Sequence, residues 1–518
     1  MTEILQHRSR AGIKMPDKNG QMHTERNRMG MERKEGTEKQ GQALQTCGQE
    51  KRGQQKHPQH GIDMLNGPLL PKVLLFAIPL AMSSCLQLLF NAADVIVLGR
   101  FVGSDALAAV GSTTALINLL VNLFIGLSVG VNVLVARHYA RNDGAMVSDI
   151  VHTAVTVALI SGIILIFVGF FFAQPMLLLM GSPENVLPMS VLYMRIYFAG
   201  MPVLLLYNFG AAILRAIGDT RRPLYYLMFA GAVNVVLNLF FVIVFNMGVA
   251  GVALATTISN FISASLIIRS LMREESSLRF DPKRMTVDIR VMRKIFTIGL
   301  PAGLQGCIFS ISNVLIQSSV NSFGSVVMAG STAAQNLEGF VYQSMNAVYQ
   351  ANLSFTSQNI GAGKYSRVNR ILLTCIFVVT VIGAGMGLMF CVFGTPLLGI
   401  YSNDPEVIRA GLIRLYFICG LYFLCGYMDV LVGSLRGMGY AILPMIVSLI
   451  GACGFRVIWI FTIFAADHTM TTLFLSYPVS WIITALAHFS CFLYLRAKLP
   501  KTDQDLSDAV TEAAAEEL

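Results

Sequence analysis

The chain has 518 residues, of which 54% are hydrophobic and 13% are charged, and its mean hydropathy is +0.62. A soluble globular protein carries about 25% charged residues. The composition therefore excludes a soluble globular protein and indicates a polytopic membrane protein. The formal net charge of +9 does not require nucleic acid as a partner, because the basic residues fall mostly in the N-terminal segment and in short loops between apolar runs.

Residues 1–64 form an N-terminal segment that is rich in Gln, Gly, Lys, Arg and Glu and nearly free of aromatic residues. Such a segment buries too little apolar surface to order itself, and it lacks the apolar stretch of a secretory signal. Two interpretations are open. The segment is either a disordered basic cytoplasmic tail or the product of a translation start placed too far upstream, with Met64 as the true beginning.

From Leu69 onward, the sequence consists of long apolar runs. Runs of about twenty residues or more favour helices over the alternating strands of a membrane barrel, because a helix satisfies its own backbone hydrogen bonds in lipid. We therefore predict an all-α membrane protein with twelve transmembrane helices in two six-helix lobes. The predicted spans are 70–99, 106–138, 147–173, 186–216, 222–246, 248–272, 293–321, 326–359, 367–393, 406–434, 441–466 and 469–497.

The longest polar stretch between spans, REESSLRFDPKRMTVD, divides the chain. We expect an N-lobe at 65–272, a cytoplasmic linker at 273–292, a C-lobe at 293–498 and a short acidic tail at 499–518.

Positive charge alternates from one loop to the next, with Arg100 as the exception. By the positive-inside rule, this alternation places both termini in the cytoplasm, and we expect a multi-pass protein of the cytoplasmic (inner) membrane. The basic loops and tail hold Arg137, Arg141, Arg215, Arg221, Arg222, the stretch from Arg269 to Lys294, Lys364, Arg367, Arg370, Arg496, Lys498 and Lys501.

The two halves resemble each other at an offset of about 220 residues. Because each half has an even number of spans, both share one orientation, as in transporters built from parallel repeats. Two matching lobes that rock against each other can open a cavity to either side of the membrane. The matching pairs are Pro79 and Pro301, Asn91 and Asn313, Gly111 and Gly330, Pro183 and Pro405, Arg195 and Arg414, Leu214 and Leu435, and Pro223 and Pro444.

A single carboxylate, Asp94, interrupts the first apolar run. A charge at membrane depth costs about 2.5 kcal/mol or more, so Asp94 either binds a cation or proton within a cavity or lies near the outer interface, capped by water. Carboxylate, amide and hydroxyl oxygens suit Na⁺, and a carboxylate alone suffices for H⁺. Asn and Thr in membranes also serve as hydrogen-bonding contacts between helices. The other candidates in this half are Tyr207, Asn208, Asn234, Asn238, Thr256 and Thr257, with Asn234 and Asn238 on one helix face.

Three charged residues lie at depth in the second half: Glu338, Asp429 and Arg456. Opposite charges within a bundle usually pair. We hypothesise that Arg456 pairs with Glu338 or Asp429, either as an ion pair that protonation loosens or as a permanent structural one.

The sequence contains neither nucleotide-binding nor metalloprotease motifs. The nine cysteines are scattered and show no metal-ligand spacing, so we interpret them as small buried hydrophobic residues. We therefore expect no enzyme activity, no cofactor and no metal beyond a transported Na⁺, and no nucleic-acid partner.

Several motifs resemble those of the MATE family, the multidrug and toxic compound extrusion transporters, in its DNA-damage-inducible-F-like prokaryotic branch. The resemblance covers about 65 to 497 and implies export of organic cations in exchange for H⁺ or Na⁺. It rests on NAADVIVLGRFVGSDALAAVG, LRAIGDTRRP, GVAGVALATTIS, EGFVYQSMNA, SQNIGAGKYSRV and LRGMGY.

The resemblance implies that four residues match functional positions of the family. Asp94 corresponds to the acid of the first helix, Tyr207 to the Tyr of the fourth, Asn234 to the Asn of the fifth and Thr256 to the Thr of the sixth. Asn238 stands where many relatives have Asp, and the seventh-helix acid is missing from AGLQGCIFSISN. Both departures leave the coupling ion open.

We predict a monomeric secondary active multidrug exporter that works by alternating access, with organic cations and membrane lipids as its partners. In this interpretation Asp94 binds H⁺ or Na⁺ with Asn234, Asn238, Tyr207 and Thr256, and Glu338, Asp429 and Arg456 form a possible second coupling site. Two alternatives stay open: a lipid-linked oligosaccharide flippase of the same superfamily, and a membrane-embedded enzyme or sensor.

Overall fold

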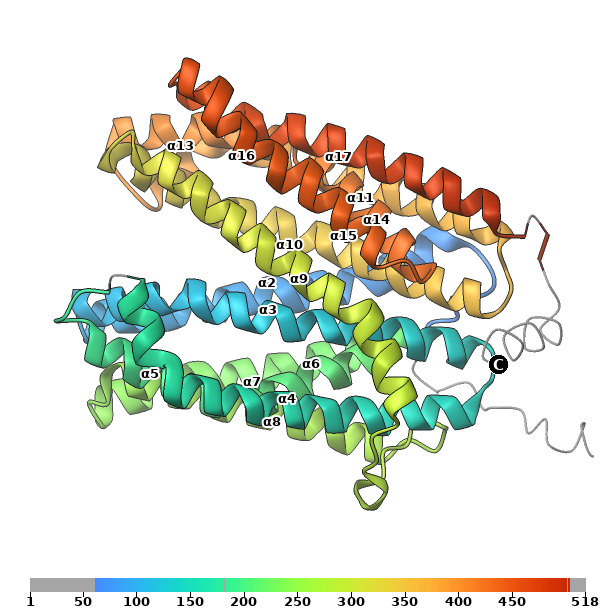
Figure 1. Ribbon diagram of the computed structural model, residues 1–518. Coiled ribbons are helices and arrows are strands. Elements are labelled where there is room, and N and C mark those ends of the chain that lie inside the picture. Colours follow the sequence, from blue (N-terminus) through green and yellow to red (C-terminus); the bar gives the residue numbers. More distant parts are fainter. Residues whose placement is uncertain (1–60, 181, 501, 504–518) are drawn as a thin grey trace, which may run out of the picture. The chain divides into compact units, whose positions relative to one another are not determined.

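The computed structural model describes residues 61–180, 182–500 and 502–503 (Figure 1). Most of the expected basic tail at 1–64 and of the acidic tail at 499–518 therefore lies outside the described residues. Met64 is buried, and its carbonyl oxygen accepts a hydrogen bond of 3.1 Å from Asn359 Nδ2. The packed part of the chain thus begins before the expected boundary at residue 65.

The first half is built of seven α-helices and one π-helical turn. Prolines begin or bend several of them, because proline fixes φ and removes a backbone donor. The elements are α2 (Leu69–Phe101), α3 (Ser104–Ala140), α4 (Gly144–Leu179), α5 (Leu187–Ala199), α6 (Met201–Ala216), α7 (Arg221–Leu239), the π-turn η1 (Phe240–Val244) and α8 (Gly248–Met272).

The second half follows a short 3-10 turn, η2 (Pro282–Arg284), in the linker, and repeats the pattern of the first half with more interruptions. Its elements are α9 (Ile289–Asn321), α10 (Ser325–Gly361), α11 (Ser366–Val392), α12 (Gly394–Gly399), α13 (Pro405–Ile418), η3 (Cys419–Leu421), α14 (Phe423–Gly437), α15 (Ile442–Ser448), η4 (Leu449–Gly454), α16 (Phe455–Trp459), η5 (Ile460–Phe464) and α17 (Met470–Lys498).

Among the described residues, nine helices are long and apolar enough to cross a membrane, and two bent pairs raise the number to eleven. The bent pairs, α5 with α6 at 47° and α13 with α14 at 43°, occupy the predicted spans 186–216 and 406–434. The one remaining predicted span, 326–359, is the helix α10. It falls short of that hydropathy test because Gln, Asn, Ser and Thr line much of its buried surface.

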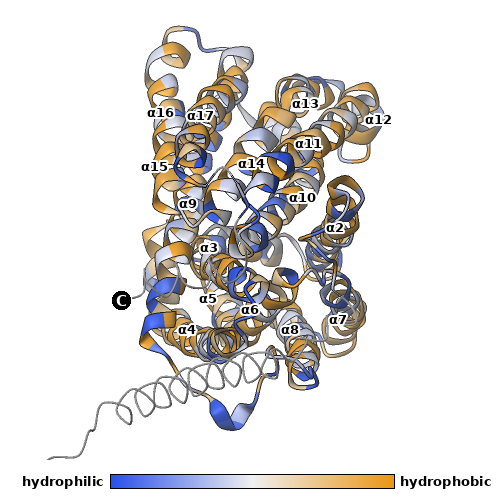
Figure 2. Cartoon of the chain, turned by 90° about the vertical axis from the view of Figure 1, so that its right-hand side faces the viewer, coloured by the Kyte–Doolittle hydropathy of each residue, from blue (hydrophilic) through white to orange (hydrophobic). Residues whose placement is uncertain are grey.

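Large apolar side chains cover the outside of the peripheral helices, whose ribbons are mostly orange in Figure 2. Phe171 on α4, Leu373 on α11 and Phe461 in η5 are 63%, 66% and 73% exposed. An apolar patch of this extent would be unfavourable in water. In a bilayer it forms the lipid-facing surface, and the chain is a multi-pass membrane protein.

The two halves meet where α9 crosses α3 (Figure 1). Small residues at the crossing let the backbones touch, as is common between helices in membranes. A Cβ placed on Gly126 would lie 2.2 Å from the backbone nitrogen of Gly303, and one on Gly130 would lie 2.4 Å from the carbonyl oxygen of Ile295. Side chains at these glycines would therefore separate the halves.

Polar contacts also join the halves near the C-terminal ends of α3, α6 and α10. Ser354 Oγ donates to Asn132 Oδ1 at 3.1 Å, and Gln358 Nε2 donates to the carbonyl of Ala216 at 2.7 Å. All of these side chains are buried. Since α2 begins at this same end of the bundle, Asp94, in the last third of α2, lies toward the opposite end.

Beside this end, the turn between α3 and α4 carries a well-formed helix cap. Asp143 Oδ1 accepts from the backbone nitrogen of Met146 at 3.1 Å, which satisfies a free donor at the start of α4. A hydrogen bond from His138 lowers the pKa of the Asp143 carboxyl.

Candidate functional site

The carboxylate of Asp94 lies among polar groups of α7 and α8. Asn238 Nδ2 donates to Asp94 Oδ1, and Thr256 Oγ1 donates to Asp94 Oδ2 at 3.3 Å. Asn238 also donates to Asn234 Oδ1 at 3.3 Å, and Asn234 Nδ2 donates to Thr256 Oγ1 at 3.4 Å. Because Asn234 and Asn238 stand four residues apart on α7, both amides reach the same cluster.

A cavity of about 180 Å³ opens beside this carboxylate. Asp94 is half-buried and lines the cavity, so its side chain is not enclosed in solid packing. Of the described residues that line the cavity, none is Lys or Arg. The negative charge is therefore held by neutral donors alone, which is an arrangement that a cation or a proton can complete.

Tyr207 lies apart from this cluster. It is buried on α6, and its Oη donates a long hydrogen bond of 3.5 Å to the carbonyl oxygen of Pro223. The tyrosine that lines the cavity with Asp94 is Tyr197 of α5. It stands in the repeated Arg195-Ile-Tyr-Phe motif, which was a sequence signal for the internal symmetry and not for this position.

In the second half, Glu338 of α10 pairs with Arg414 of α13 and not with Arg456. Arg414 Nε and Nη2 donate to the two carboxylate oxygens at 2.7 and 2.8 Å, and Nη1 donates to Ser331 Oγ at 3.0 Å. Both members of the pair are buried. The predicted pairing of Glu338 with Arg456 is wrong because a guanidinium nearer to the carboxylate already uses both of its oxygens.

Arg456 is held by aromatic rings in place of a carboxylate. Its guanidinium carbon lies 4.2 Å from the ring centre of Tyr477 and 5.8 Å from that of Trp481, both on α17. Its Nε donates to Ser480 Oγ at 2.8 Å. The side chain is 3% exposed, and within the described ranges no carboxylate lies within 4.0 Å of it, so the expected pair with Asp429 is absent there too.

Two further charged residues, Asp429 and Arg436, lie on α14 near Arg456 and Glu338. Arg436 Nη1 donates to Tyr349 Oη at 2.7 Å and Nη2 donates to Gln305 Oε1 at 2.8 Å. The Oδ2 atom of Asp429 is buried and accepts no hydrogen bond from the described residues.

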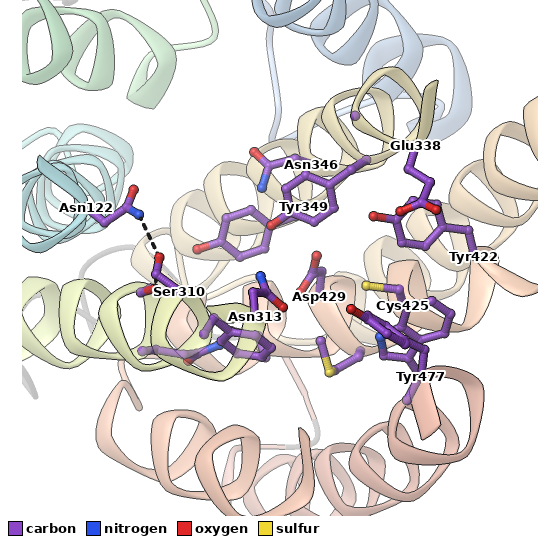
Figure 3. Close-up of a pocket in the computed structure, with 18 of the residues that line it drawn as sticks. Asn122, Ser310, Asn313, Glu338, Asn346, Tyr349, Tyr422, Cys425, Asp429 and Tyr477 are labelled. Carbon is purple, nitrogen blue, oxygen red and sulfur yellow. Dashed lines mark hydrogen bonds between the residues drawn. The ribbon is translucent and has the colours of Figure 1, made fainter. Parts of the chain in front are cut away.

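These charged residues line one cavity of about 500 Å³ (Figure 3). In the figure, Tyr349, Asn346, Asp429 and Asn313 point toward a common space. The lining contains three arginines and two carboxylates, because Arg414 and Arg436 join Arg456, Glu338 and Asp429 there. The sequence analysis singled out neither Arg414 nor Arg436 as a site residue. The internal repeat offered a signal for both, because it matches Arg195 to Arg414 and Leu214-Arg215 to Leu435-Arg436.

The sequence pattern of the MatE family matches the chain twice, at residues 79–240 and 301–462. The chain belongs to the MatE family. Two curated relatives from Bacillus subtilis (strain 168) are similar over most of their length. The probable multidrug resistance protein YpnP is 29% identical, with 85% of this chain and 98% of the relative covered, and the probable multidrug resistance protein YoeA is 26% identical, with 82% and 93% covered.

A solved structure described as an outward-facing multidrug resistance MATE family transporter of the MOP superfamily has the same fold. It superposes with a TM-score of 0.80 at 20% identity, and the match covers 86% of this chain and 100% of that one. The fold is thus the MATE arrangement of twelve transmembrane helices in two lobes. The two-lobe fold predicted from the sequence is confirmed.

The two family matches begin 222 residues apart, at residues 79 and 301. This offset is shared by the pairs Pro79–Pro301 and Asn91–Asn313, and it pairs Asp94 with Ile316. The second half of this MatE protein therefore has an aliphatic residue where the first half has its carboxylate.

Proposed function

We propose that this MatE transporter is a secondary active multidrug exporter of the cytoplasmic membrane, with both termini in the cytoplasm. It exchanges organic cations and other xenobiotics for H⁺ or Na⁺ by alternating access, and it works as a monomer. Its relatives YpnP and YoeA are both named as probable multidrug resistance proteins, which supports a role in multidrug efflux. The coupling ion, its site and the substrate class are our inference.

One observation supports Asp94 as the site of the coupling cation. Its carboxylate lines a cavity, is held by Asn238 and Thr256, and shares that cavity with no basic side chain of the described chain. A group of this kind binds a cation because leaving a charge uncompensated at membrane depth is costly. Binding neutralises the carboxylate, so its hydrogen bonds to α7 and α8 weaken.

The coupling then follows from linkage. If the neutralised state of the cluster favours one orientation of the lobes and the charged state favours the other, cation entry drives the exchange of orientations. The crossing of α9 over α3, with its touching glycines, is the contact about which the two halves can rock.

The test is flux in proteoliposomes under an imposed Na⁺ or pH gradient, with wild type and Asp94→Asn. We expect wild-type protein to accumulate a fluorescent organic cation only when one gradient is present. Asp94→Asn should reduce gradient-driven flux about 100-fold, because the amide is a permanent mimic of the neutral state. Asp105→Asn, an exposed carboxylate at the start of α3, is the matched control and should transport normally. Full gradient-driven flux in Asp94→Asn would overturn the proposal.

A further inference from the structure

We propose that the 500 Å³ cavity of the second half binds aromatic molecules that carry a carboxylate. This inference rests on the proposed export function and names a substrate class for it that differs from simple organic cations. Three observations carry it: the charge balance of the cavity, the geometry of Arg456 and the row of aromatic rings beside it.

The cavity has more positive than negative charge to offer a ligand. Glu338 is saturated, because both of its oxygens accept from Arg414. Arg436 and Arg456 then face a single remaining carboxylate, Asp429. Since a guanidinium stays protonated in proteins, one unit of positive charge is left in a buried site. A buried charge of this kind is unfavourable unless an anion joins it.

Arg456 is positioned to meet that anion. Its Nε is fixed by Ser480 and its plane rests against Tyr477, while its two terminal nitrogens donate to no described residue. These nitrogens are not among the fully buried unpaired atoms, although the residue as a whole is 3% exposed. They therefore reach the cavity, where the planar fork of an arginine matches the two oxygens of a carboxylate.

A row of rings forms one wall of the cavity next to Arg456. Tyr342 stacks on Tyr422 with ring centres 6.4 Å apart, Tyr422 stacks on Trp481 at 5.3 Å, and Trp481 meets Tyr477 edge to face at 5.8 Å. Flat aromatic walls with a few placed polar groups are typical of sites for drug-sized molecules, and the cavity has a volume in that range. The ligand thus combines a planar ring system with an anionic group.

Asp429 lines the same cavity, but its Oδ2 atom is fully buried and does not open into it. The charge of Asp429 offsets one of the two remaining arginines, so one unit of positive charge is left for the carboxylate of a ligand. In the first half, the carboxylate of Asp94 lines the cavity and none of the described residues that line it is Lys or Arg. The two halves therefore present opposite charge to a ligand.

Equilibrium binding of two dyes to the purified, detergent-solubilised full chain tests this. Rhodamine 110 has a free carboxyl group, and rhodamine 123 is its methyl ester with the same amino-substituted ring system. Fluorescence anisotropy should show that wild type binds rhodamine 110 about tenfold more tightly, as expected for one charge-assisted hydrogen-bonded contact. Binding needs no ion gradient, so the result does not depend on coupling.

Variants assign the preference to Arg456. Arg456→Gln should bring the two dyes to within about twofold of each other, and Arg456→Lys should keep part of the preference because it retains the charge but not the fork. Arg195→Gln, which removes an exposed arginine outside the cavity that lies over Phe170, is the matched control and should bind as wild type does. If thermal melting shows that Arg456→Gln is unfolded, the dye preferences of Arg456→Lys and of the control Arg195→Gln still test whether Arg456 carries the preference.

Equal wild-type affinity for the two dyes, binding of neither dye by folded protein, or a full preference in Arg456→Gln would each overturn the inference. Asp94→Asn separates it from the proposed function, since that variant should lose gradient-driven flux and keep the dye preference. A wild-type protein that shows the preference but no flux under any gradient would overturn the export proposal and support the binding site.

Discussion

The two halves of this transporter share a scaffold and differ in the charge at its centre. In the first half, one carboxylate sits among neutral donors beside a cavity that holds no basic side chain of the described residues. In the second half, three arginines and two carboxylates line a larger cavity. At the 222-residue offset, Ile316 stands where the first half has Asp94. The three arginines of the second cavity have no basic counterpart among the described residues that line the first.

This difference teaches how a repeat can divide two tasks. A shared backbone places side chains at matching depths, so substitutions at a few lining positions change which charge a lobe binds. In our interpretation the first half binds the coupling cation, and the second half uses most of its charges to hold itself together and to recognise substrate. Glu338 and Arg414 form a buried ion pair in the second half. In the first half, Arg195, which the repeat matches to Arg414, is exposed and lies over the ring of Phe170.

The largest effect is expected from breaking the Glu338–Arg414 pair. Glu338→Gln leaves a buried guanidinium without its carboxylate, which destabilises the fold by about 3–5 kcal/mol. We expect a large drop in the midpoint of thermal unfolding in detergent, and a similar drop for Arg414→Gln. A double-mutant cycle should give strong coupling between these two residues and little between Glu338 and Arg456.

Strong coupling between Glu338 and Arg456, with weak coupling to Arg414, would contradict the pairing in the structure and restore the pairing predicted from sequence. Asp404→Asn, which alters an exposed helix cap at the start of α13, is the control for the loss of an acid in the same half.

A second acid beside Asp94 should sharpen the contrast between the halves. In Asn238→Asp, a carboxylate replaces the amide that donates to Asp94 Oδ1, so the cluster gains a negative charge and loses a donor. Cation affinity rises with the number of charged ligands. We expect the half-saturating concentration of the coupling cation in the flux assay to fall about tenfold.

Asn208→Asp is the matched control for that substitution. Its amide donates within α6 to the carbonyl of Leu204 at 2.9 Å and lies outside the cavity of Asp94. An unchanged cation dependence in Asn238→Asp would separate Asn238 from the coupling site.

Sequence alone predicts the helices well, because apolar runs report membrane crossing directly. The predicted span 248–272 coincides with α8, and the face shared by Asn234 and Asn238 follows from helical spacing. Hydropathy does not report a bend, so the breaks in the spans 186–216 and 406–434 appear only in the structure, although Pro202 stands at the first of them.

The partners of buried charges are harder to predict. Whether Glu338 meets Arg414 or Arg456 depends on how α10 is rotated against α13, and periodicity within one helix does not contain that information. Arg436 and the wall of Tyr477 and Trp481 were missed for the same reason. Their roles depend on contacts between different helices, of α14 with α9 and α10 and of α16 with α17. By contrast, Asp94 was found because a lone acid in an apolar run needs no partner to be noticed.

The smallest expected effect separates two tyrosines of the first half. Tyr197 lines the cavity of Asp94, whereas Tyr207 lies outside it and makes a long hydrogen bond to Pro223. Tyr197→Phe should raise the half-saturating cation concentration about two- to threefold, since one neutral hydrogen-bonding group is lost from the cavity. Tyr207→Phe should change it by less than about twofold, because a bond of 3.5 Å contributes little. The reverse result, with Tyr207→Phe impaired and Tyr197→Phe normal, would place Tyr207 in the coupling site as the sequence resemblance implies. It would then also indicate that α6 turns toward Asp94 when the lobes exchange orientation.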